Sequence, residues 1–434
     1  MGKLLYLCLL ISIPLSAQEI PMATQLGGSP FFIKKTWYIG GVGNWDSLTI
    51  DPTAQQLYIA HGPVVQVVSI DSGELIAQIS GFREAHSIVI DDSGTYAYVS
   101  DGQADAVDVV DLRRLEIEST MPIYCSPRSI AFEPSSQLVF VICGANAAIP
   151  SIRESPLPQR TTTGNRPVSQ TDQQAQSDFS GISHVVVIDA TTKTVIADFA
   201  VAGDFRFAQP DGDGHVYVSV GEAHQAWIDN GRKAQADFPQ SIARLDGPAI
   251  AARANQQLDA HSNSMSSSKK PVHIDWSHNA NPGADLRFLP LRSNCSNPQG
   301  LAVDGKHLRL FLACDDQKLL VLNAGTGDPV ASLTTGPGDD ALGYDQGRGL
   351  VYVANGAGYG SLTVIRQDET TDSYEVIQNL PTRERAHTVA VDSSTGEIYL
   401  VTDFHGVDLT KPGTIGTMKA TPVNGSFQVL VVGH

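Results

Sequence analysis

The chain has 434 residues, which is too long for one small domain, although a repeat fold fills this length as a single unit. Its formal net charge of −17 makes nucleic acid a poor candidate partner, because a chain of this charge does not attract a phosphate backbone. The 39 glycines and 24 prolines are scattered along the chain, as is typical of an all-β protein with many turns.

The first 17 residues have the composition of a secretory signal peptide. Lys3 supplies a positive start, residues 4–15 are apolar, and Ser16 and Ala17 are the small residues before the expected cleavage. The apolar core is too short to span a bilayer, and no later stretch reaches the ~18 apolar residues of a membrane helix. We therefore expect export to the periplasm, the cell surface or the medium; a short membrane anchor is the alternative.

After a lead-in at residues 18–35, a short pattern occurs seven times: a polar residue, a small residue, an apolar one, any residue, an apolar one and an acid. Each copy is followed by a turn and a second apolar strand, and most are followed by a third. A four-stranded repeat of ~40 residues is typical of a β-propeller blade. The copies are DSLTID (46–51), HSIVID (86–91), RSIAFE (128–133), the weaker RFAQPD (206–211), QGLAVD (299–304), DALGYD (340–345) and HTVAVD (387–392).

Two long spacings between copies are insertions rather than missed blades. The stretches at about 145–183 and 253–285 are rich in Ser, Thr, Gln, Pro and Asn, and residues 249–260 have the pattern of a short helix. The seventh copy lacks a fourth strand, whereas an extra strand, TWYIGG, precedes the first copy at residues 36–41. Pairing this strand with the C-terminal one would close a seven-bladed β-propeller over residues 36–434 and leave no open edge.

Residues 351–356, VYVANG, resemble the name-giving motif of the YVTN-repeat seven-bladed β-propellers, with Ala in place of Thr. The stretches VVVIDATTKTVIADF (185–199) and LLVLNAGTGDPVASL (319–333) are similar to the third strand, turn and fourth strand of that family. The resemblance covers residues 36–434 outside the two insertions. It implies a propeller of a mostly secreted or surface-exposed kind with binding roles, and it carries no shared catalytic motif.

Four cysteines remain after the signal peptide, as two pairs at equivalent places in the third and fifth copies. One member of each pair precedes the first strand and the other ends the second strand. In an antiparallel hairpin these positions face each other, so we expect disulfides Cys125–Cys143 and Cys295–Cys314. Export agrees with oxidised cysteines, and buried free thiols are the alternative.

The first strand of a propeller blade lines the central channel, and the residue that opens it faces one mouth. This residue is polar in all seven copies, with carboxylates and imidazoles on one side of the ring and guanidinium groups on the other. The candidate mouth residues are Asp46, His86, Arg128, Arg206, Gln299, Asp340 and His387. The acidic side suits a divalent cation and the arginine side an anion; the alternative is that these side chains only satisfy one another and ordered water.

No HExxH, CxxCH, G-x-S-x-G or P-loop motif is present, and we expect neither a metal nor a cofactor. Residues 210–217, PDGDGHVY, lack the later ligands of a calcium loop and fall where a hairpin turn is due.

The favoured interpretation is a secreted, monomeric, non-enzymatic scaffold that binds a small anionic ligand or another secreted protein. The alternative is a hydrolase of the propeller lactonase type, in which a His or Asp at the mouth activates water and an Arg steadies the oxyanion.

Overall fold

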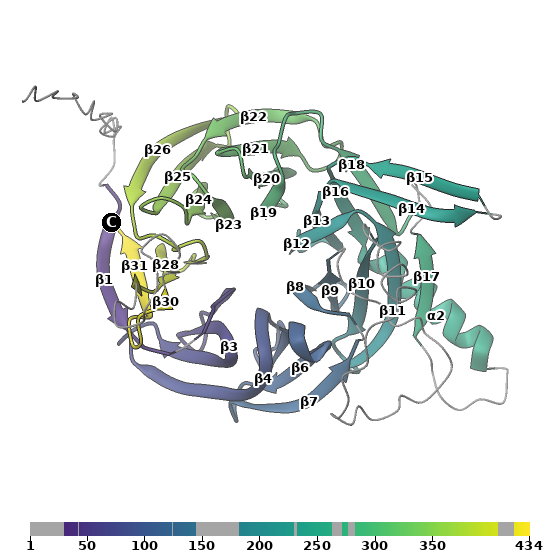
Figure 1. The fold of residues 1–434 in the computed structure, drawn as a ribbon, viewed down its shortest axis with the longest axis horizontal. Coiled ribbons are helices and arrows are strands. Elements are labelled where there is room, and N and C mark those ends of the chain that lie inside the picture. The colour runs from purple at the N-terminus through teal and green to yellow at the C-terminus, as the bar shows by residue number, and fades with distance from the viewer. Residues whose placement is uncertain are drawn as a thin grey trace, which may run out of the picture.

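The computed structural model describes residues 30–41, 43–123, 125–144, 182–229, 232–262, 271–276, 283–406 and 421–434. The predicted signal peptide, most of the lead-in and nearly all of the first insertion lie outside these residues. The chain is an all-β β-propeller, with its large sheets set around a central opening (Figure 1). A search of the described residues finds no helix with the length and apolar content needed to cross a membrane.

The first two copies of the repeat share one six-stranded sheet, and each other copy has a sheet of its own. The six-stranded sheet contains β2 (Leu48–Asp51), β3 (Gln56–Ser69), β4 (Leu75–Ile90), β5 (Tyr96–Asp101), β6 (Ala106–Asp111) and β7 (Glu116–Pro122), with the 3₁₀ helix η1 (Gly102–Ala104) between β5 and β6. The register shifts near Gly62 in β3 and near Ala85 in β4, where each long strand passes between the two halves of the sheet.

In the sheets of the third to sixth copies, the strands follow chain order from the channel outward. The third copy forms β8 (Pro127–Glu133), β9 (Leu138–Cys143), β10 (Ile182–Asp189) and β11 (Thr194–Ala202); the fourth forms β12 (Asp204–Pro210), β13 (His215–Gly221), β16 (Ser241–Asp246) and β18 (Leu286–Pro290). The fifth forms β19 (Pro298–Asp304), β20 (Arg309–Cys314), β21 (Lys318–Asn323) and β22 (Pro329–Thr334); the sixth forms β23 (Asp339–Asp345), β24 (Leu350–Asn355), β25 (Ser361–Asp368) and β26 (Ser373–Pro381).

The sheet of the seventh copy departs from this order, because it joins both ends of the described chain. From the channel outward it contains β27 (Val389–Asp392), β28 (Glu397–Thr402), β31 (Gln428–Gly433) and β1 (Phe32–Tyr38). β1 is antiparallel to β31, with Thr36 opposite Leu430. The N-terminal strand therefore pairs with the C-terminal one; it begins at Phe32 and ends at Tyr38, earlier than the predicted residues 36–41.

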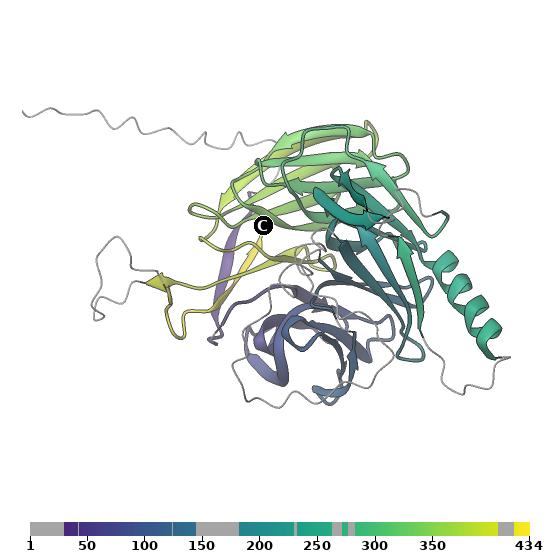
Figure 2. The same ribbon diagram turned by 45° about the vertical axis from the view of Figure 1, so that its right-hand side comes forward.

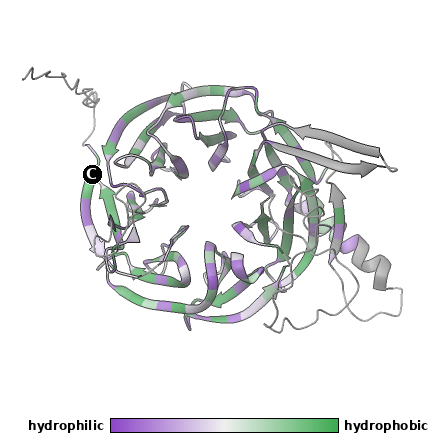
Figure 3. Cartoon of the chain, in the orientation of Figure 1, coloured by the Kyte–Doolittle hydropathy of each residue, from purple (hydrophilic) through white to green (hydrophobic). Residues whose placement is uncertain are grey.

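The core lies between neighbouring sheets, because both faces of each sheet are covered. In the fully buried β9, alternate side chains point to opposite faces. Phe140 and Ile142 pack toward the fourth copy, and Val139 and Val141 pack toward the second. Figure 3 shows apolar residues along the strands of all the large sheets.

The acid that ends each copy of the repeat caps the turn between the first and second strands. Asp51 accepts hydrogen bonds from the backbone N–H groups of Thr53 and Ala54, each at 2.9 Å. Asp211 accepts the N–H of His215 at 3.0 Å in the same way, so residues 210–217 form a hairpin turn, as predicted. The capping acids are Asp51, Asp91, Glu133, Asp211, Asp304, Asp345 and Asp392.

The second insertion is more ordered than its polar composition suggests. The predicted helix is present as α2 (Gly247–Ser262), which buries Ile250 and Ala254 in the core. β17 (Val272–Trp276), which the sequence did not predict, extends the sheet of the third copy by pairing in parallel with β11. α2 lies outside the ring beside β17, and the hairpin of β14 (Ala223–Asp229) and β15 (Arg232–Phe238) projects on the same side (Figures 1 and 2).

Both predicted disulfides are confirmed. Cys125 is bonded to Cys143 with their Cα atoms 5.9 Å apart, and Cys295 is bonded to Cys314 with a Cα separation of 5.3 Å. Each bond ties the chain before a first strand to the end of the second strand of the same sheet.

Candidate functional site

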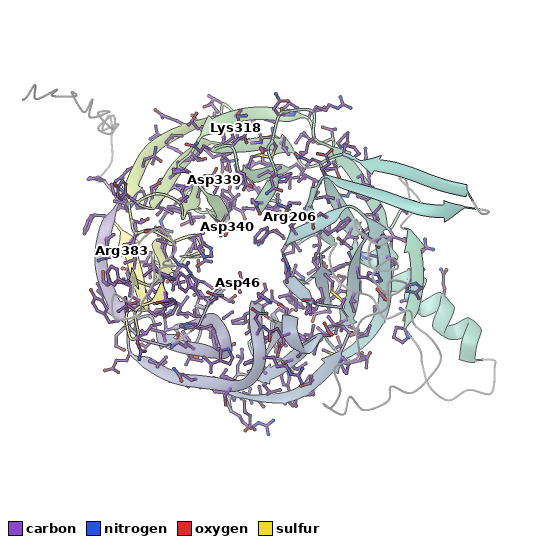
Figure 4. The ribbon with its side chains drawn as sticks, viewed as in Figure 1. Asp46, Arg206, Lys318, Asp339, Asp340 and Arg383 are labelled. Carbon is purple, nitrogen blue, oxygen red and sulfur yellow. A yellow bond between two sulfur atoms is a disulfide. The ribbon has the colours of Figure 1, made fainter. Side chains whose placement is uncertain are left out.

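A cavity of about 650 Å³ occupies the centre of the ring. It is lined by the first strands of the sheets and by the residues just before them, because these strands are the innermost in every sheet. Figure 4 shows Asp46, Asp340 and Arg206 extending toward the central opening from different sides. Six of the seven predicted mouth residues line this cavity: Asp46, Arg128, Arg206, Gln299, Asp340 and His387.

The seventh predicted residue, His86, reaches the site through Asp46. Its Nδ1 lies 2.8 Å from Asp46 Oδ2 in a hydrogen bond, and its Nε2 lies 3.5 Å from a Glu84 carboxylate oxygen. Burial lowers the pKa of His86, but the hydrogen bond to Asp46 and the charges of Asp46 and Glu84 outweigh it, so that pKa is raised. Because the two carboxylates stabilise the imidazolium, His86 holds its proton more firmly than an ordinary histidine.

Asp46 lies inside the ring, where protein surrounds its carboxyl group even though 44% of the side chain stays exposed. This enclosure raises the pKa of Asp46. His86 lowers that pKa by its hydrogen bond and charge, and the nearby charge of Asp340 raises it. The carboxylates of Asp46 and Asp340 therefore influence each other across the acidic side of the cavity.

His387 forms a second imidazole–carboxylate pair on this side. Its Nδ1 lies 2.9 Å from Asp340 Oδ2, without the alignment of a hydrogen bond. Its ring stacks on the indole of Trp45, with 5.9 Å between centroids, and the Arg385 guanidinium lies 4.9 Å from the same indole. Within the described ranges the Nε2 atom of His387 has no hydrogen-bond partner, and His387 lines the cavity.

The two arginines on the opposite side differ from each other. Arg206 is already neutralised: its Nη2 and Nε lie 2.7 and 2.8 Å from Asp204 Oδ2, and its Nη1 donates to the Pro298 carbonyl at 3.2 Å. Arg128 is exposed, and no carboxylate among the described residues lies within ion-pair distance of it. On the arginine side of the mouth, Arg128 is therefore the guanidinium with no carboxylate partner among the described residues, and an anion site on this side stays a prediction.

Gln299 faces the same cavity but is held by a neighbour. Its Nε2 donates to Asp315 Oδ1 at 3.0 Å. The sequence missed Asp204 and Asp315, although both lie at the mouth ends of strands of their own sheets. Asp204 opens β12 two residues before Arg206, so the ion pair could have been anticipated from the short spacing.

A further acid at this end of the ring, Asp339, was also missed. It is fully buried, accepts a hydrogen bond from Thr335, and lies at the start of β23 beside the predicted Asp340. Burial raises the pKa of Asp339 to about 7, and the charges of Asp315 and Asp316 act in the same direction. Its other carboxylate oxygen has no hydrogen-bond partner in the described part of the chain.

The described residues give the cavity two imidazole–carboxylate pairs and one guanidinium without a carboxylate partner. Among the residues that the structure describes, no three His, Cys, Asp or Glu side chains have the arrangement of a metal site. An imidazole oriented by a carboxylate accepts a proton when it is neutral and donates one when it is charged, and a guanidinium binds an anion in bidentate fashion.

No protein-family model matches the chain, and no curated protein matches it. Solved structures match its fold. One described as "Structure of U3-55K" has a TM-score of 0.58 and 8% sequence identity, over 92% of this chain and 98% of that chain. One described as "Crystal structure of RRP9 WD40 repeats" has a TM-score of 0.57 and 9% identity, over 95% of this chain and 100% of that chain. At such low identity the likeness is one of fold alone: the chain is a β-propeller similar in architecture to WD40 propellers.

Proposed function

We propose that this protein is a binding scaffold that holds a small anionic ligand in the central cavity. The observation that carries this proposal is that Arg128 has no carboxylate partner among the described residues, whereas Arg206 is neutralised by Asp204 at 2.7 Å. An anionic group placed on Arg128 would leave the rest of the ligand facing the acidic side of the cavity. There, Asp46 and Asp340 suit a cationic or hydroxyl group of the ligand.

The proposal includes a seven-bladed ring of the YVTN-repeat kind. Dividing the six-stranded sheet into two blades at the bends near Gly62 and Gly81 supports this count, because both glycines have positive φ values, of 58° and 119°. Each half then contains one copy of the repeat and four strand segments. In this count β1 supplies the outer strand of the seventh blade.

Export of the protein also belongs to the proposal. Two disulfides within the propeller support it, because such bonds persist mainly in oxidising compartments. The proposal is thus of a monomeric scaffold that acts outside the cytoplasm.

A second candidate function is hydrolysis of a lactone at the same cavity. It is favoured by the open Nε2 of His387, whose Nδ1 lies 2.9 Å from Asp340. In that reaction His387 would take a proton from water, and the water oxygen would attack the ring carbonyl carbon. Arg128 would stabilise the oxyanion, and the proton would pass to the leaving alkoxide as the ring C–O bond breaks.

Calorimetric titration with acetate, inorganic phosphate and γ-butyrolactone tests both functions. We expect R128M to weaken binding of the preferred anion by at least tenfold. The matched control is the double variant R206M/D204N, which removes a guanidinium without changing net charge and should bind almost as the unaltered protein does. Identical curves for R128M and the unaltered protein would refute the anion site. Lactone opening that H387N abolishes would instead favour the hydrolase.

A further inference from the structure

A second, smaller cavity of about 210 Å³ lies beside the chain segment that follows β28. Its wall includes the apolar residues Pro422, Val423 and Phe427, and its polar members are His61, Asp403 and Asn424. Val423 is 47% exposed, which is unusual for an apolar residue at a cavity edge. The cavity has room for one large apolar side chain, the kind of anchor that dominates protein–protein contacts.

An exposed aromatic residue is hydrogen-bonded to the edge of this cavity, and an arginine lies over its ring. Phe404 is 43% exposed, and its carbonyl accepts a hydrogen bond from the N–H of Val423 at 2.7 Å. The guanidinium of Arg383 lies 5.1 Å from the centroid of the Phe404 ring. No carboxylate among the described residues is within ion-pair distance of Arg383, so its charge is available to a partner.

The segment that carries Arg383 is held rigidly by its own backbone. Thr382 donates its N–H to the Gly360 carbonyl at 3.0 Å, and Arg385 donates its N–H to the Gly356 carbonyl at 2.7 Å. Gly360 has a φ of +75°, and a Cβ there would lie 1.8 Å from the Arg383 carbonyl oxygen. The glycine thus permits the close approach, and the fully exposed Tyr359 next to it extends the same surface.

The guanidinium of Arg383 is the charged group beside the cavity that favours an acidic partner. Asp403 is already engaged, 2.9 Å from His405 Nδ1 and 3.4 Å from Arg385 Nε. The exposed Glu384 between the two arginines balances the remaining formal charge, so an acidic partner would be attracted by the guanidinium of Arg383 itself and not by a net positive surface.

We propose that this surface docks a short segment of a partner protein in which a large apolar residue stands next to an acidic one. The apolar side chain fills the 210 Å³ cavity beside Val423. The neighbouring carboxylate pairs with Arg383 above the Phe404 ring. Arginine and aromatic side chains around an anchor pocket have the composition of interface hot spots, and the rigid backbone lowers the entropic cost of binding.

The probes are synthetic nonapeptides with a central Leu, Phe or Met, flanked either by Glu and Asp or by Lys. Fluorescence anisotropy should show the acidic set binding at least tenfold more tightly than the lysine set, with the affinity falling as salt rises. R383E should weaken the acidic set by at least tenfold, and V423D should abolish binding. The controls R366E and V330D make the same changes away from this cavity, at exposed Arg366 in β25 and exposed Val330 in the outer strand β22, and should bind as the unaltered protein does.

Three outcomes would overturn the proposal. The first is that no peptide of either set binds, and the second is that R383E and R366E have equal effects. The third is that sedimentation velocity shows a dimer which V423D dissociates, since the surface would then bind a second copy of the chain. None of these depends on Arg128, and R128M should leave peptide binding unchanged, so this test is independent of the one for the central cavity.

Discussion

Within β19, Asp304 and Gln299 stand at opposite ends of the same innermost strand and have opposite environments. Asp304 is completely buried and accepts hydrogen bonds from the His307 N–H at 3.2 Å, His307 Nδ1 at 2.7 Å and Gln367 Nε2 at 2.9 Å. Gln299 lines the cavity and bonds only to an exposed carboxylate. The same contrast recurs around the ring: the turn end is always an acid, and the mouth end changes from copy to copy.

The two ends of the innermost strands therefore have different roles: the turn end stabilises the fold, and the mouth end supplies side chains to the central cavity. A carboxylate at the turn end is needed wherever the chain reverses, because it satisfies backbone N–H groups that the hairpin leaves unpaired. At the mouth end of the strand, no backbone N–H group of the described residues depends on the side chain, so the residue there can differ from copy to copy. The chemistry of a ligand site is therefore expected at the mouth and not at the turns.

Removing a turn acid should have the largest effect on stability. We expect Asp304→Ala to lower the free energy of unfolding by roughly 4–5 kcal/mol, because three hydrogen bonds to a buried carboxylate are lost. Gln299→Ala, in the same strand, should cost under about 0.5 kcal/mol. Chemical denaturation of both variants measures the two losses in the free energy of unfolding. Equal losses would contradict the different roles of the turn end and the mouth end.

Asp339 sharpens the comparison, since it is a buried acid at the mouth end. Hydrogen bonds outweigh burial and lower the pKa of Asp304, whereas burial raises the pKa of Asp339 to about 7. Ionising Asp339 therefore costs stability, from nothing below its ordinary pKa near 4 to a maximum of about 4 kcal/mol above pH 7. Asp304 acts in the opposite sense, because its stabilisation is lost as the pH falls below 4.

The corresponding test is Asp339→Asn, which should raise the thermal midpoint at pH 8 and leave it almost unchanged at pH 4. The neutral amide removes the cost of the buried charge while keeping the shape of the side chain. Measuring both variants, Asp339→Asn and Asp304→Asn, at the two pH values provides the control. A midpoint that falls at pH 8 in Asp339→Asn would show that the carboxylate is stabilising.

The two disulfides lie at the mouth end of their sheets, and removing one tests how much this end contributes to stability. The expected effect is smaller than that of removing a turn acid. Each disulfide closes a loop of 18 or 19 residues, worth about 3 kcal/mol if the bond acts by restricting the unfolded chain. The double variant C125S/C143S should lose about that amount, and C295S/C314S should lose a similar amount. Non-reducing peptide mapping checks the pairing, and a link between the two pairs would contradict it.

The sequence predicted the ring well because the repeat encodes it locally. The strand, turn and acid occur together in each copy, so seven imperfect copies predicted the innermost strands and their turns. The unexpected β17 pairs with β11 over a long separation in the chain, and nothing in its polar surroundings indicated a partner.

The site was predicted less fully than the ring. The residues of the mouth followed from their position in the repeat, but their pairing did not. Asp204 cancels Arg206 while Arg128 has no such neighbour in the described part of the chain, and this depends on side-chain directions that periodicity does not specify. The same holds for Arg383, which lies between copies and was not singled out.

The most direct test of the central claim measures stability and anion affinity in the same two variants, R128M and D304A. We predict that R128M keeps the thermal midpoint of the unaltered protein, within the effect of about 0.5 kcal/mol usual for a surface change, and loses anion binding at least tenfold. D304A should show the reverse, with a much lower midpoint and an unchanged dissociation constant at a temperature where it is folded. Loss of binding in D304A, or a destabilised R128M that binds normally, would contradict the separation of the two strand ends.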